Sequence, residues 1–180
     1  MAITDTRHIV LEPPAGSAPG AGLWIAALAD GRRRTLETLE RVEPEMVDGD
    51  VPGQQHTLGT LLYHIALIEA DWLFVEIQER DTYPEEAAAL FPWSDRDEQG
   101  RLISVTGLSL EAHLERLNRV RALLVETLMG LSDDDFSRAR EIPGVVVSTA
   151  WVIHHLLQHE AEHRGELGQI LDTLRQNAPA

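Results

Sequence analysis

Four segments of this chain carry apolar residues at steps of three and four positions, and prolines and glycines separate the segments. That spacing places the apolar side chains on one face of an α-helix. Four amphipathic helices can bury their apolar faces against one another, so the sequence predicts an all-α four-helix bundle. The expected helices run from Leu23 to Glu43, from Thr57 to about Arg80, from Ser109 to Gly130, and from Ser148 or Thr149 to about Gln176.

The connection between the second and third expected helices is long, because residues 81–107 contain several prolines and glycines. A helical turn is expected within it, at Glu85 to Leu90. The bundle should therefore have one long crossover. Val145 to Val147 could form a brief extended piece, but a single strand would have nothing to pair with, so no sheet is expected.

The N-terminal residues have a different character from the rest. Residues 13–22 are rich in proline, glycine and alanine, and charged residues stand earlier where a secretory signal would need an apolar core. A length of 180 residues fits one domain. We expect a flexible arm over residues 1–19, a single helical domain over 20–176, and a short tail over 177–180.

Composition excludes several kinds of site and partner. The chain has no cysteine, so any metal must be held by His, Asp or Glu, and no cysteine nucleophile exists. Its 15 basic and 30 acidic residues give a net charge of −15, which disfavours nucleic acids and anionic membrane surfaces as partners. Apolar stretches such as Leu58 to Leu62 look too short to span a bilayer. A cytoplasmic protein is expected.

The histidines carry the strongest functional signal. His154, His155, His159 and His163 lie within ten residues of the last expected helix. His159 and His163 are four apart, so their rings lie on one helix face, where both can bind one ion at about 2.0–2.1 Å. They share the apolar face of the helix, and a buried imidazole needs partners for both ring nitrogens. The pair predicts a divalent metal site.

A third ligand should come from another helix. His64 stands three residues after Leu61 and four before Ile68, within the apolar face of the second helix. His155 is the alternative, although a row with four-residue steps drifts by about 40° per step around the helix. Three histidines without an obvious fourth protein ligand leave coordination positions open, which is typical of catalytic rather than structural zinc sites. His113 is expected at the edge of the core.

The segment from His159 to His163 also reads H-E-x-x-H, the signature of a class of zinc peptidases. The longer form of that motif has Gly and His where this chain has Glu166 and Gln169. Such peptidases present their substrate along a sheet edge, and no sheet is expected here. Peptidase activity is therefore disfavoured, and Glu160 is expected on a solvated face or behind the ligands.

The segment from His159 to Leu167, in which Arg164 and Gly165 follow the second histidine, resembles the hallmark of the DinB-like metalloprotein superfamily, also called YfiT-like. In that family another histidine, early in the second helix, completes the site, and His64 has that position here. The resemblance covers roughly residues 20–176 and implies metal ligands at His64, His159 and His163. Gly165 would allow close helix approach, and Arg164 would pair with an acid.

The resemblance also implies a chemistry. Family members commonly bind zinc or nickel, form homodimers, and include mycothiol-dependent maleylpyruvate isomerase and bacillithiol S-transferases. It implies a metal-dependent transferase that takes a low-molecular-weight thiol as cosubstrate and acts on a small molecule; water activation for hydrolysis is a further option. A non-enzymatic metal-binding or stress-response protein, or a structural helical dimer, are the alternatives. The general base stays open, because Glu69, Asp71 and Glu160 are candidates by proximity alone.

Overall fold

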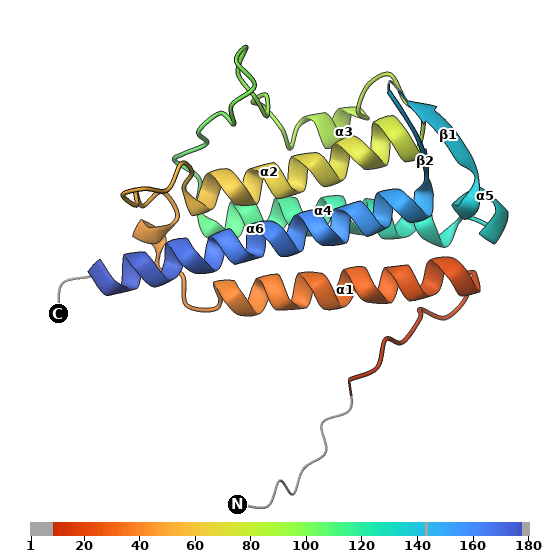
Figure 1. The fold of residues 1–180 in the computed structure, drawn as a ribbon, viewed down its shortest axis with the longest axis horizontal. Coiled ribbons are helices and arrows are strands. Elements are labelled where there is room, and N and C mark those ends of the chain that lie inside the picture. Colours follow the sequence, from red (N-terminus) through yellow and green to blue (C-terminus); the bar gives the residue numbers. More distant parts are fainter. Residues whose placement is uncertain (1–8, 143, 178–180) are drawn as a thin grey trace, which may run out of the picture.

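The computed structural model describes residues 9–142 and 144–177, and its main feature is a bundle of four long helices (Figure 1). The all-α four-helix prediction is confirmed. In Figure 1, α6 crosses the whole bundle between α1 and α2, with α4 behind it. The long helices are α1 (Pro19–Leu39), α2 (Leu58–Asp71) with its π-helical continuation η2 (Trp72–Ile77), α4 (Leu110–Met129) and α6 (Thr149–Asn177).

Hydroxyl side chains cap three of these helices, at the positions where the sequence predicted that the helices start. Thr57 Oγ1 accepts a hydrogen bond from the Thr60 amide at 3.2 Å, and Ser109 Oγ accepts one from Ala112 at 3.2 Å. Ser148 Oγ accepts one from the Trp151 amide at 3.3 Å. These bonds satisfy amide groups that have no partner in the first turn of a helix.

Helix α1 differs from expectation in its bounds and in the face that it buries. It starts at Pro19 and ends at Leu39. Proline is favourable there because it lacks the backbone N–H that would have no hydrogen-bond partner in the first turn. Leu23 and Leu36 fit the apolar spacing in the sequence, but in the structure they are 53% and 36% exposed. The buried face is instead formed by Ala21, Gly22, Ile25, Ala26, Leu28, Arg32, Thr35 and Leu39. A charged residue therefore lies within the apolar face of this helix.

The crossover between α2 and α4 is long and contains the expected helical turn, α3 (Glu85–Ala88). Short elements η1 (Pro44–Met46) and α5 (Asp133–Ser137) lie in the other connections. The expectation that Val145 to Val147 would have no partner was wrong. Strand β1 (Ala139–Ile142) pairs antiparallel with β2 (Val145–Ser148), with Ala139 opposite Ser148. Strand β2 ends at Ser148, directly before α6, so the hairpin fixes the position of the first turn of α6.

The core consists mainly of leucine and isoleucine from the four long helices. The whole helix Leu58–Ile77 is long and apolar enough to cross a membrane by length and composition, although uninterrupted apolar stretches within it, such as Leu58 to Leu62, are short. However, 78% of its most apolar window is buried inside the protein. Such burial is typical of the central helix of a soluble protein.

Candidate metal centre

The three histidines predicted as ligands meet at one point. His64 comes from α2, and His159 and His163 lie one turn apart on α6. His159 Nε2 lies 3.1 Å from His64 Nε2 and 3.2 Å from His163 Nε2. Two nitrogens bound to one tetrahedral ion at 2.0–2.1 Å stand about 3.3–3.4 Å apart, so these rings are nearly at the required spacing. Within the described part of the chain, the group has these three members.

The donor set fits a cation better than it fits hydrogen bonding among the rings. His159 Nε2 faces two other ring nitrogens and has at most one proton to share between them. A metal ion accepts the lone pairs of all three nitrogens at once. Three imidazoles without thiolates suit zinc, nickel or another borderline divalent ion.

Carboxylates orient two of the rings from behind. His64 Nδ1 lies 2.7 Å from Asp95 Oδ1, and His163 Nδ1 lies 3.0 Å from Glu166 Oε2. An imidazole that donates its Nδ1 proton to a carboxylate presents its Nε2 lone pair on the opposite side. Both rings are thereby held in the tautomer that a metal ligand requires. Asp95 lies in the crossover, and the sequence analysis did not single it out.

The electrostatics of the centre also favour a neutral ring at His159. Burial, together with the neighbouring His163 and His64, lowers the pKa of His159 to about 3. Since a metal binds the unprotonated imidazole, no proton has to be displaced from His159 near neutral pH.

A cavity of about 740 Å³ opens beside the three histidines. Its wall combines the loop before α2, the crossover loop and the face of α6. The polar side chains that line it include Gln54, Gln55, His56, Arg96, Arg101, Glu166 and Gln169. An ion held by the histidine triad would face a space of the size that small-molecule sites occupy.

The other histidines of the described residues do not join the centre. The ring of His155 stacks on Trp151 with centroids 5.3 Å apart, and its centroid lies 6.0 Å from that of His159. His155 is therefore not brought to the triad, and His64 supplies the third nitrogen. His154 is exposed and lies beside Trp24. His8 lies outside the described residues.

Three expectations about single residues were wrong. His113 is fully buried on α4 rather than at the edge of the core. An added Cβ at Gly165 would meet nothing within 4 Å, so this glycine does not serve a close helix approach. Arg164 donates to the Gly31 carbonyl at 3.4 Å, and no acid is its partner among the described residues.

The acids proposed as bases lie away from the cavity. Glu160, expected on a solvated face or behind the ligands, is 3% exposed and bound to Arg32 and Arg121. Burial would raise its pKa, but the two guanidinium groups lower the pKa to about 2. Glu69 lies in the same buried group. Burial raises the pKa of Asp71, the remaining candidate, which does not line the cavity.

A bundle of four long helices that gathers three histidines beside a polar cavity defines a helical protein able to hold a metal ion. Comparison with known families identifies the superfamily: the family model of the DinB superfamily matches residues 27–167. The chain belongs to the DinB superfamily, which confirms the resemblance found in the sequence. No curated protein matches this chain.

Proposed function

We propose that this DinB-superfamily protein binds a divalent ion, zinc or nickel, through His64, His159 and His163 and is a metal-dependent enzyme of the S-transferase type. The observation that carries the proposal is the convergence of three Nε2 atoms at the wall of an open cavity. A structural metal site has four protein ligands and is closed, whereas a catalytic one keeps a position for substrate or water.

The ion, when bound, would lower the pKa of a thiol or water ligand and so supply a nucleophile at neutral pH. Because the chain has no cysteine, the nucleophilic sulfur has to belong to a low-molecular-weight cosubstrate. Asp95 and Glu166 hold the ligand rings in place during this reaction. Burial lowers the pKa of His56, which lines the cavity, so its neutral ring is available to accept the thiol proton.

The small-molecule substrate would enter through the cavity, where arginine and glutamine side chains offer hydrogen-bond donors. We do not expect nucleic acid as a partner, because the net charge of −15 repels a phosphate backbone. Following the resemblance, we expect a cytoplasmic homodimer. Sedimentation equilibrium on the metal-loaded protein tests the oligomeric state.

The alternative function is a non-enzymatic metal-binding or stress-response protein, which would share the triad but need no cavity beside it. The cavity of about 740 Å³ favours the enzyme. Metal-activated hydrolysis remains the second reaction that the same geometry supports.

The test uses purified protein loaded with zinc or nickel, its metal content measured by elemental analysis. Thiol consumption with a small electrophilic acceptor is compared for wild type, His159→Ala, and the control His154→Ala, which alters an exposed neighbour outside the triad. We expect turnover in wild type and control alone. Bound metal with thiol consumption at background would overturn the S-transferase proposal and leave hydrolysis or a non-enzymatic role. Failure to bind metal would overturn all three.

A further inference from the structure

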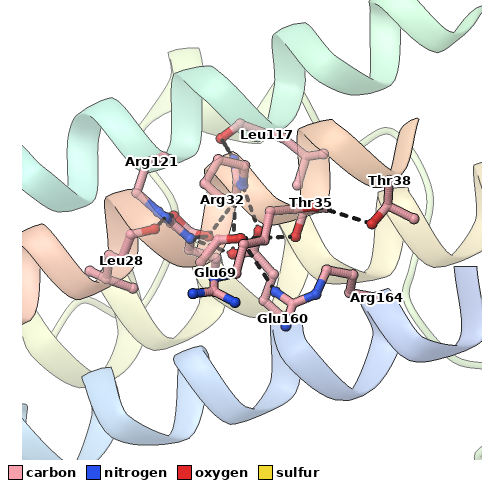
Figure 2. A network of polar contacts seen from close by, with 11 residues as sticks. Leu28, Arg32, Thr35, Thr38, Glu69, Leu117, Arg121, Glu160 and Arg164 are labelled. Atoms are coloured by element: carbon pink, nitrogen blue, oxygen red, sulfur yellow. Dashed lines mark hydrogen bonds and ion pairs between the residues drawn. The ribbon is translucent and has the colours of Figure 1, made fainter. Parts of the chain in front are cut away.

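A second group of polar side chains lies in the centre of the bundle, apart from the histidines. It has one member from each long helix: Arg32 from α1, Glu69 from α2, Arg121 from α4 and Glu160 from α6 (Figure 2). Their exposed fractions are 5%, 2%, 9% and 3%. The formal charges of this buried charge group cancel.

Each arginine binds both glutamates. Arg121 binds Glu69 in a bidentate manner, with contacts of 2.6 and 2.8 Å, and its Nη2 also donates to Glu160 Oε2 at 2.8 Å. Arg32 Nε donates to Glu160 Oε1 at 2.8 Å, and Arg32 Nη2 donates to Glu69 Oε2 at 3.0 Å. The four side chains form a closed ring of charge-assisted hydrogen bonds.

The remaining donors tie the two arginine-bearing helices to each other. Arg32 Nη1 donates to the Leu117 carbonyl of α4 at 2.9 Å, and Arg121 Nη1 donates to the Leu28 carbonyl of α1 at 2.7 Å. A planar guanidinium offers its donors in a fixed fork, which a lysine cannot reproduce. The spacing of the helices is therefore fixed by geometry as well as by charge.

The two glutamates stand on the two helices that carry the histidines. Glu160 directly follows His159 on α6, and Glu69 comes five residues after His64 on α2. Since a helix turns by about 100° per residue, each glutamate lies on a different face from the neighbouring histidine. The histidines face the cavity while the glutamates face the arginines. The arginines thus hold α2 and α6 together just behind the triad.

We propose that Arg32 and Arg121 are positioning residues for the metal centre: by binding Glu69 and Glu160 together, they set the α2–α6 spacing at which the Nε2 atoms converge. This inference rests on the proposed function. Metal sites need their ligands held within about 0.5 Å of the productive geometry. A purely stabilising role explains the group less well, because apolar side chains of similar volume often stabilise a core equally or better.

The test measures Co(II) affinity and the visible Co(II) absorption spectrum, which reports coordination geometry, alongside thermal unfolding of the metal-free protein. Glu69→Gln keeps the shape of the side chain and Arg121→Lys keeps its charge, but each breaks the ring. We expect Co(II) binding to weaken by about tenfold to a hundredfold, with a changed spectrum. A matched control is Arg140→Met, which removes a buried arginine at the hairpin that donates to Thr149. It should lower stability while Co(II) affinity and spectrum stay unchanged.

A second variant separates positioning from stability. Replacing all four members at once (Arg32→Met, Glu69→Leu, Arg121→Met, Glu160→Leu) leaves no buried charge unpaired, so the bundle should still fold. If the single variants unfold, this fourfold variant alone tests whether the arginines position the metal ligands. We expect weak Co(II) binding in a stable protein. Wild-type affinity and spectrum in this variant, or in the folded single variants, would overturn the inference and leave the proposed function intact. Absence of Co(II) binding by wild type would overturn the proposed function instead.

Discussion

The imidazole of His64 and the carboxylate of Asp95 lie 2.7 Å apart, from Nδ1 to Oδ1, across 31 residues of chain. Asp95 comes from the crossover loop, and both side chains are largely buried. The contact fastens this loop to a predicted metal ligand. It also fixes which nitrogen of His64 faces the other two histidines, so the loop helps to define the centre without entering it.

Asp95→Asn should weaken zinc binding by about tenfold to a hundredfold, because an amide oxygen holds the Nδ1 proton less strongly than a carboxylate. Competition with a chromophoric chelator measures the affinity. Asp97→Asn is the control, since Asp97 lies in the same loop, is only partly exposed and binds Arg101 rather than a histidine. Equal affinity in the two variants would show that Asp95 does not orient the ligand.

Zinc should stabilise the protein against heat. At a free concentration one hundred times the Kd, an ion that binds only the folded state adds about 2.7 kcal/mol, or about 5–10 °C in Tm for a chain of this size. Differential scanning calorimetry with and without zinc measures the shift. His163→Ala should remove it and His154→Ala should retain it. A zinc-induced shift that survives in His163→Ala would place the ion elsewhere.

Acid should destabilise the metal-free protein partly through His113. Burial and the nearby Arg116 lower the pKa of His113 to about 4 in the folded state, against an ordinary value of 6.5. Between these two pH values the unfolded chain binds more protons, so stability falls as pH falls, by at most about 3 kcal/mol from this group. Urea unfolding at pH 7 and pH 4.5 measures the loss. His113→Gln should show a smaller loss than wild type, and an equal loss would contradict the assignment.

Gly165→Ala should raise stability by about 0.5–1 kcal/mol, because glycine is unfavourable within a helix and the added Cβ meets no atom. Gly59→Ala is the opposite case: its Cβ would lie 3.1 Å from His113 Nε2 and 3.3 Å from Asp48 Oδ1. Thermal unfolding compares the two, and Gly59→Ala should show no gain. A loss of stability in Gly165→Ala would mean that this glycine has a packing role after all.

The sequence predicted the elements whose signals are local. Capping residues such as Thr57 and Ser109 mark helix starts within a few positions, and four-residue spacing places His159 and His163 on one face. His64 was found because it interrupts an otherwise apolar face. The fold class and the histidine triad were therefore predictable from short-range pattern.

Features that depend on partners distant in sequence were missed. Glu160 and Arg32 look like solvated helix residues when each is considered alone, and only the assembled bundle pairs them over 128 residues. Strand β1 was missed because Ala139, Arg140 and Glu141 have no strand preference. Asp95 lies in an irregular loop, where spacing carries no information on which side chain it will meet.

The buried charge group has a consequence for how the chain folds. A partly assembled bundle that lacks any one of α1, α2, α4 or α6 would leave at least one charge without its full set of partners in an apolar interior, which is strongly unfavourable. Intermediates with two or three docked helices are therefore higher in free energy than both the folded and the unfolded chain. The bundle should behave as a single cooperative unit, and fragments that omit one long helix should not form stable sub-bundles.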